Sequence, residues 1–113
     1  MSIKTGQVGV ALNLWAEFDM SAGGATFALE LTDPDGVVQA EKTPTLNTSV
    51  VVVPDDVIDE ATGLPMVDFP ANESVLYTTV ADDFAIAGIW RAVVRFTDGT
   101  KILRGKEILI GVD

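Results

Sequence analysis

Carboxylates are the side chains of this sequence with the widest scope for chemistry, because the chain has seventeen Asp and Glu residues but no His and no Cys. The absence of His removes the commonest general base near neutral pH and the commonest metal ligand. Ser21, Ser49 and Ser74 therefore lack a base to activate them, and no Ser-x-x-Lys spacing occurs. The glycine-rich phosphate motifs GxGxxG and GxxxxGK(S/T) are also missing.

A pair of carboxylates can act as the acid and base of a glycosidase, and composition alone does not exclude such a pair. The chain is small, however, and its eight aromatic residues (two Trp, one Tyr and five Phe) must also fill the core. An aromatic-rich groove for a sugar chain is therefore not expected. We expect no catalytic residues, no cofactor and no enzymatic activity.

The densest group of acidic residues lies in the irregular stretch 54–70, PDDVIDEATGLPMVDFP, and consists of Asp55, Asp56, Asp59, Glu60 and Asp68. Calcium binds six to eight oxygen ligands, and these carboxylates could supply several. Their spacing matches no EF-hand loop, so we expect no metal site. A structural loop is the favoured interpretation, followed by a contact in an assembly. The second interpretation makes Asp55, Asp56, Asp59 and Glu60 candidate partner-contact residues.

The basic residues gather near the end of the chain. The net charge is −10, yet the last part of the sequence holds Arg91, Arg95, Lys101, Arg104 and Lys106. Strand alternation places Arg91 and Arg95 on one outward face. They either pair with acidic residues on neighbouring strands or form a basic face that meets an acidic patch on another copy or partner. The second interpretation makes Arg91 and Arg95 candidate partner-contact residues.

Trp15 is the aromatic candidate for a protein contact. It lies in the stretch 8–18, where a strand would place it on the face opposite Leu12 and Leu14. Ala and Leu also favour a helix there, but the glycines on both sides of Val8 favour a strand or loop. Trp15 either packs beneath a loop or stays exposed at an interface, where Trp is enriched among the residues that dominate binding.

The stretch 81–111 predicts the two strands around which the chain is organised. The first strand has the period-two pattern of one buried face, with Trp90, Ala92, Val94 and Phe96 pointing inward. Asp98-Gly99 then predicts a tight hairpin, and Ile102, Ile108 and Ile110 mark the return strand. Upstream, 82–90 has the spacing of the corner before the penultimate strand of an immunoglobulin-like sandwich, with Trp90 in the usual place of a tyrosine.

Further strands are predicted over 8–18, 26–32, 37–41, 49–53 and 73–81. Asp33-Pro34-Asp35-Gly36 predicts a turn that joins 26–32 and 37–41 in a hairpin. The four consecutive valines of 50–53 predict either a strand buried on both faces or an edge strand that a neighbouring subunit covers.

About seven short strands separated by turn motifs predict an all-β fold, namely an immunoglobulin-like antiparallel β-sandwich. We expect one domain over 1–113, with an irregular excursion at 54–70. The net charge of −10 disfavours binding to nucleic acid and to anionic membranes. No apolar run reaches the roughly 20 residues of a membrane helix, and no secretory signal is evident.

Three motifs occur in a familiar order along the chain. They are the opening KTGQVGV at 4–10, the hairpin LELTDPDG at 29–36, and YTTVADDFAIAGIWRA at 77–92 with an Asp-Gly hairpin after it. In this order the chain resembles the small immunoglobulin-like domains of tailed-bacteriophage virion proteins, such as the N-terminal domains of upper baseplate proteins. The resemblance covers most of the chain except the 54–70 excursion.

The resemblance implies a virion structural protein that mediates assembly or decoration of the capsid, neck, tail or baseplate. It implies many copies or a homo-oligomer, other virion structural proteins as partners, and synthesis in the host cytoplasm. We expect no receptor-binding domain after Asp113, and this expectation favours an accessory or decoration protein, or a small neck or tail component. An alternative class, a module that binds carbohydrate or a host surface, needs exposed aromatics on one face, and Trp15 with Tyr77 is the candidate pair.

Overall fold

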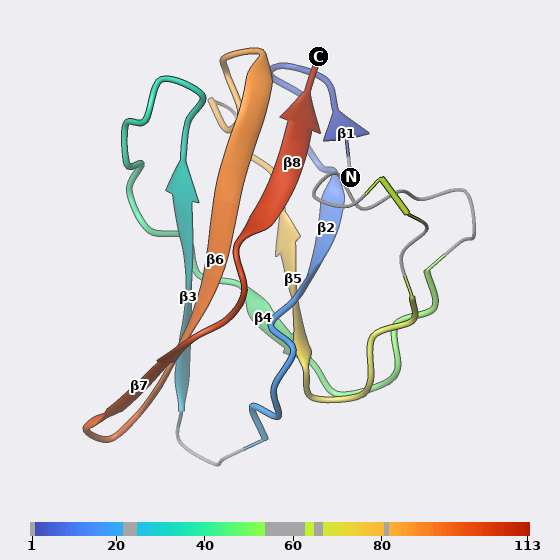
Figure 1. Cartoon of the computed structure of the whole chain (residues 1–113), viewed down its shortest axis with the longest axis vertical. Helices are drawn as coiled ribbons and strands as arrows, with labels where there is room; N and C mark the ends of the chain where they lie inside the picture. The colour runs from blue at the N-terminus through green and yellow to red at the C-terminus, as the bar shows by residue number, and fades with distance from the viewer. Residues whose placement is uncertain (1, 22–24, 54–62, 65–66, 81) are drawn as a thin grey trace.

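The computed structural model of the 113-residue chain describes residues 2–21, 25–53, 63–64, 67–80 and 82–113. Within them the regular elements are all β-strands (Figure 1). They are β1 (Ser2–Ile3), β2 (Ala11–Trp15), β3 (Thr26–Thr32), β4 (Thr45–Asn47), β5 (Ser74–Thr78), β6 (Gly88–Asp98), β7 (Lys101–Arg104) and β8 (Ile108–Val112). The predicted all-β class is therefore confirmed.

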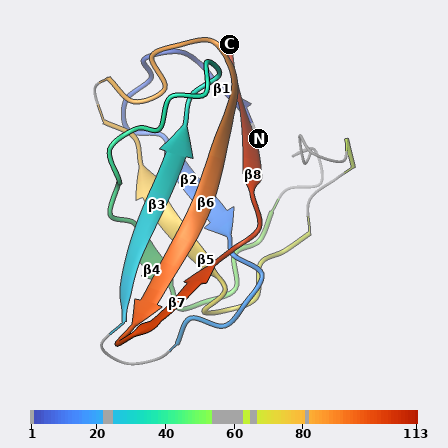
Figure 2. The same ribbon diagram turned by 60° about the vertical axis from the view of Figure 1, so that its left-hand side comes forward.

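The strands form two sheets that lie one over the other (Figure 2). The smaller sheet has the order β2-β5-β4, and the larger has the order β1-β8-β6-β3, with β7 also paired to β6. These pairs are antiparallel except β1 with β8, which is parallel. Two facing sheets with their inner side chains between them make a β-sandwich.

β6 is the long central strand of the larger sheet, and β7 and β8 pair with successive parts of one of its edges. Asp98 pairs with Lys101, so the hairpin loop consists of Gly99 and Thr100. Gly99 has φ +60°, which glycine adopts without steric cost. Between the β7 and β8 pairings the register shifts by one residue. This β-bulge, around Gly105, divides the predicted return strand into two.

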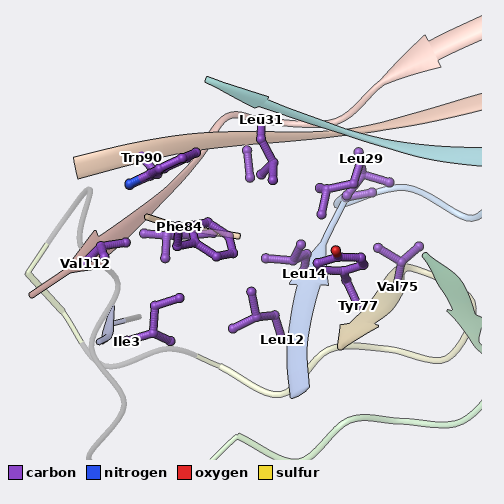
Figure 3. Packing of buried hydrophobic residues seen from close by; sticks show 14 of the residues in the cluster. Ile3, Leu12, Leu14, Leu29, Leu31, Val75, Tyr77, Phe84, Trp90 and Val112 are labelled. Carbon is purple, nitrogen blue, oxygen red and sulfur yellow. The ribbon is translucent and has the colours of Figure 1, made fainter. Parts of the chain in front are cut away.

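The core lies between the sheets and follows the predicted alternation (Figure 3). The larger sheet contributes Leu29, Leu31 and Trp90 among others, and the smaller sheet contributes Leu12, Leu14, Val75 and Tyr77. Removing a large apolar side chain from water contributes roughly 1.5–3 kcal/mol. The strands that present these side chains at every second position are therefore held face to face by their burial.

The loop before β6 closes one end of the core. The Trp90 indole Nε1–H donates to the Ile86 carbonyl oxygen at 2.8 Å. The Trp90 ring also meets the Phe84 ring edge to face, with 5.0 Å between centroids. Gly88 has φ +134° and lies against Pro34, where an added Cβ would be 2.8 Å from two ring carbons. An indole therefore closes this corner at the residue that the sequence indicated.

The turn at 33–36 forms as predicted, but the strand expected after it does not. The Asp33 carboxylate accepts hydrogen bonds from the backbone N–H groups of Asp35 and Val37, both at 2.9 Å, which fixes the turn. The segment 37–42 then follows the free edge of β3 through two isolated bridges, at Val38 and Lys42, and forms no regular strand. The β3 edge is nevertheless covered.

The strand predicted over 49–53 is wrong, because the strand in this part of the chain is β4, at 45–47. Within the valine run, Val51 makes one isolated bridge with Phe69, while Val50 and Val52 are exposed. High β-propensity shows that a segment tolerates an extended backbone, but a strand also requires a partner. The β5 edge pairs with 45–47 instead. Most of the 54–70 excursion lies outside the described residues.

Candidate functional site

Asp83 is a buried titratable residue with partners from both sheets. Its buried carboxylate accepts hydrogen bonds from the Tyr77 hydroxyl at 2.5 Å and from the Val80 backbone N–H at 2.9 Å. The Lys42 ammonium lies 3.0 Å from its other oxygen. Lys42 is itself bonded through its backbone to Leu29 of β3. The carboxylate therefore ties the smaller sheet, through Tyr77, to the edge of the larger one.

The pKa shifts indicate that this group of residues has a structural role. We call Lys42, Tyr77, Val80 and Asp83 the clamp. Burial acts to raise the pKa of the Asp83 carboxyl, but the hydrogen bonds from Tyr77, Val80 and Lys42 outweigh it and hold the pKa below its usual range. Burial and the bond to Asp83 raise the pKa of the Tyr77 hydroxyl. At neutral pH the carboxyl is ionised and the phenol is protonated, so neither group is poised to transfer a proton.

A cavity of about 200 Å³ opens beside the clamp, between Leu31, Lys42, Asp82 and Trp90 among other residues. Two of the charged residues in its wall, Lys42 and Asp83, are paired with each other. The exposed Asp82 is the remaining charge of the wall. The cavity therefore offers no acid–base pair. Sequence reasoning missed this cluster. Tyr77 and Asp83 both lie in the motif at 77–92, but Lys42 is distant in the sequence, and no spacing rule indicates that the three side chains meet.

Trp15 is half-buried on the outer face of the smaller sheet, opposite Leu12 and Leu14, as predicted. Its ring stacks on Phe69 with 5.5 Å between centroids and 17° between planes. Its indole Nε1–H donates to the Glu73 carboxylate at 3.3 Å. Phe69 exchanges two backbone hydrogen bonds with Val51. Trp15 therefore packs beneath the segment at 67–70, while part of its ring stays accessible.

Arg91 and Arg95 lie on the outer face of β6, as predicted, and both are paired within the chain. Arg95 makes two hydrogen bonds to Glu41, at 2.5 and 2.8 Å, and lies 3.6 Å from Glu30. Arg91 pairs with Glu107 at 3.1 Å. The bonds to Glu41 raise the pKa of the Arg95 guanidinium. This is the cross-strand pairing that the sequence allowed as one of two interpretations.

The outer face of β6 therefore carries both positive and negative side chains and is not a basic face. Arg104, opposite Arg95 in the register, pairs with Glu30 at 2.9 Å. The two like charges thus share one carboxylate between them. Lys101 and Lys106 are exposed and have no ion-pair partner among the described residues.

The remaining candidate contact residues, Asp55, Asp56, Asp59 and Glu60, lie outside the described residues. Within the part of the chain that the structure describes, no three His, Cys, Asp or Glu side chains are grouped so that they could hold a metal ion. The same described residues include no helix with the length and hydropathy to cross a membrane.

Exposed apolar side chains occur in three segments at the end of the sandwich that Trp90 closes, which we call the loop end and define as residues 4–9, 33–38, 79–80 and 82–89. The loops are joined there by hydrogen bonds from Gly9 to Thr79 and from Gly6 to Phe84, and by the contact of Pro34 with Gly88. The loop end lies at the top of Figure 1. Its exposed members are Val8, Val37, Val38, Val80, Ile86 and Ile89.

The exposure of these side chains is large: Val38 is 73% exposed and Val8 is 62% exposed. Apolar side chains grouped on a surface with polar surroundings commonly mark a place where another protein binds. The sequence analysis did not select this surface, because its residues come from three segments that are far apart in the sequence. It becomes visible only when the loops are brought together by the fold.

The described residues define the protein as an all-β fold with two sheets arranged as a sandwich. Comparison of the chain with protein-family models, with curated proteins and with solved structures found no match.

Proposed function

We propose that the sandwich has the immunoglobulin-like topology. In that fold strands B, E and D lie in one sheet, and C, F and G lie in the other. The order β2-β5-β4 fits B-E-D, and the order β8-β6-β3 fits G-F-C. The hydrogen bond of Trp90 to the backbone four residues upstream supports this assignment, because a corner tyrosine bonds to the backbone in the same way at the start of strand F.

We further propose that the chain is a non-enzymatic structural protein of a tailed-bacteriophage particle. It mediates assembly or decoration of the capsid, neck, tail or baseplate through contacts with other virion proteins, in many copies. The observation that carries a contact role is the loop end, where three adjoining segments each expose apolar side chains. The assignment to a phage particle is supported by the motif order described above.

The saturated Asp83 cluster supports a role without catalysis. A catalytic carboxylate must be free to exchange a proton or to attack a substrate. Asp83 is instead buried and bonded to Tyr77, Val80 and Lys42. Its geometry is that of a link between the two sheets.

The alternative function, a module that binds carbohydrate or a host surface, loses the aromatic pair on which it depended. Tyr77 is buried in the core, and its hydroxyl is bonded to Asp83. Trp15 lies on the other face of the smaller sheet, stacked on Phe69. The two rings therefore form no shared aromatic platform.

The direct test is quantitative mass spectrometry of phage particles purified by density gradient from the culture that produces this chain. We expect peptides of the chain at a fixed ratio to the major virion proteins, and recovery only in the unassembled fraction would contradict the proposal. A variant with Val38→Ser and Ile86→Ser should lose incorporation and keep its fold. The matched control is Val52→Ser with Val67→Ser, which changes two side chains that are at least as exposed but lie away from the loop end.

A further inference from the structure

One long edge of the smaller sheet is open. β2 pairs with β5 on one side, in a register that runs from Ala11↔Thr78 to Trp15↔Ser74. Within the described residues no strand pairs with its other side. Figure 1 shows β2 at the margin of its sheet.

The hydrogen bonds show which backbone groups face this open edge. Val10 accepts from Thr79 N–H, and Ala16 N–H donates to Glu73, so the even-numbered positions of this segment face β5. Successive residues of an antiparallel ladder alternate between facing the partner and facing away. The N–H and C=O groups of Ala11, Asn13 and Trp15 therefore lie in the plane of the sheet and point away from β5, toward the open edge.

The edge is open because the N-terminal strand belongs to the other sheet. Ser2 and Ile3 pair in parallel with Gly111 and Val112 of β8, and Thr5 N–H donates to the Asp113 carbonyl. In the immunoglobulin topology the first strand commonly pairs with strand B, which β2 represents in our assignment. That position beside β2 is vacant in the described chain.

The usual protections against edge pairing are absent from β2. Charged side chains, Pro and short length make an edge strand unattractive to another strand. Residues 5–16 contain no charged residue and no Pro, although the chain as a whole carries a net charge of −10. The other edges differ, because the segment 37–42 covers β3, Pro44 precedes the three-residue β4, and β1 has two residues.

We propose that the open edge of β2 pairs antiparallel with β2 of a second copy of this chain, around a two-fold axis at Asn13. Asn13 then faces Asn13 of the second copy, and Ala11 faces Trp15. In this register all three outward-facing residues form hydrogen-bonded pairs, and the large Trp15 lies beside the small Ala11. A two-fold contact uses the same surface on both copies, so the assembly closes as a dimer.

The register favours a second copy as the occupant, because it places Asn13 opposite Asn13 and Ala11 opposite Trp15 on both sides of one two-fold axis. Charge limits where that copy can approach. Two chains of net charge −10 repel each other, and they approach most easily through surfaces without carboxylates. The segment 5–16 is such a surface. The inference rests on the proposed function in that it names a partner for a protein that acts through protein contacts.

The first test is sedimentation equilibrium of the wild type and of Asn13→Asp. The aspartate keeps the oxygen that accepts from the Asn47 side chain, at 3.0 Å in the wild type, so the monomer should fold. It places two carboxylates opposite each other at the two-fold axis. We therefore expect the dissociation constant of the dimer to rise at least tenfold. Thr45→Asp adds the same charge to the exposed surface of β4 and should leave the dimer unchanged.

The second test fixes the register by a disulfide, since the chain has no native Cys. Residues in a hydrogen-bonded antiparallel pair have Cα atoms about 5.5 Å apart, which lies within the range of roughly 4.4–6.8 Å for a disulfide. Asn13→Cys should therefore give a covalent dimer on mild oxidation, and Thr45→Cys should not. Ala11→Pro, which removes an outward N–H, should abolish the dimer.

A wild-type chain that stays monomeric, or a dimer that Asn13→Asp leaves intact, would overturn the pairing. Equal crosslinking of Asn13→Cys and Thr45→Cys would overturn it as well. None of these results affects incorporation of the chain into particles, which is measured separately. Failure of the pairing and failure of the proposed function are thus distinguishable.

Discussion

The Asp83 carboxylate joins the end of β5 and the loop after it to Lys42, which is distant in sequence. It receives hydrogen bonds from β5 and from the loop at 80, and it pairs with Lys42 beside β3. A buried charge is tolerated only when it is paired and hydrogen-bonded. Its neighbours Asp82 and Phe84 both have positive φ, at 71° and 51°. The backbone strain at these two residues is offset by the contacts that Asp83 and Phe84 make in the interior.

The lowered pKa of Asp83 predicts acid sensitivity. The hydrogen bonds favour the ionised form in the folded state, so the folded pKa lies below the unfolded value of about 3.9. The resulting stabilisation is present above about pH 4 and is lost as pH falls through the folded pKa. We expect Asp83→Asn to be less stable than the wild type at pH 7, and the difference to shrink below pH 4.

Urea denaturation of both proteins between pH 7 and pH 2.5 measures this difference. Asp68→Asn is the control, because Asp68 is exposed and accepts one hydrogen bond, from the Val53 N–H. A difference between wild type and Asp83→Asn that stays constant with pH would show that Asp83 contributes by its shape and not by its charge.

Arg95 tests how far the ion pairs on β6 contribute to stability. Its pairs with Glu41 and Glu30 lie at the surface, where water screens such interactions and their contribution to stability is small. Arg95→Gln should therefore lower the melting temperature only slightly, and the decrease should be smaller in high salt. Thermal denaturation at two salt concentrations measures both effects. A large decrease that salt leaves unchanged would indicate that the pairs are far less solvated than their exposure implies.

At the scale of elements, the corner before β6 depends on one glycine. Gly88 has φ +134°, and an added Cβ would lie 2.8 Å from Pro34. Backbone strain of this kind contributes roughly 1–3 kcal/mol, so Gly88→Ala should destabilise the fold by about 2 kcal/mol or more, as measured by urea denaturation. Ala87→Ser, at an exposed neighbouring position, should change stability by less than about 0.5 kcal/mol. Equal effects would show that Pro34 moves aside freely.

Local pattern predicted the elements whose evidence is local. The alternation of Trp90, Ala92, Val94 and Phe96 and the Asp-Gly sequence after them specified β6 and its hairpin, because periodicity and turn chemistry belong to neighbouring residues. The strand predicted from the valine run at 50–53 is wrong, since the pairing of a strand depends on a partner elsewhere in the chain. The pair of Asp83 with Lys42 and the stacking of Trp15 on Phe69 are also non-local, so no spacing rule indicated them.

For the candidate contact residues, too, the local features could be predicted and the non-local ones could not. Alternation correctly placed Trp15, Arg91 and Arg95 on outward faces, because the direction of a side chain follows from its position in the strand. It did not show that Phe69 covers Trp15 or that Glu41 neutralises Arg95. The loop end could not be predicted either, because it exists only when three loops meet.

At the scale of the whole molecule, net charge determines how the proposed dimer responds to salt. Each chain carries −10, so two copies repel each other over a distance that salt shortens. The proposed contact at β2 contains no charged residue. Salt should therefore screen only the repulsion, and the dimer should become tighter as NaCl rises from about 0.02 M to about 0.3 M, where the Debye length falls from roughly 20 to 6 Å.

A contact between a basic face and an acidic patch predicts the reverse. Attraction between Lys101 or Lys106 and carboxylates of another copy would be screened by the same salt, so the dimer would weaken. Sedimentation equilibrium across this range of NaCl separates the two contacts by the sign of the change. Lys101→Gln with Lys106→Gln makes the comparison sharper. The substitution raises the repulsion and should weaken a β2 dimer only in low salt, whereas it should abolish a dimer held by those lysines at every salt concentration.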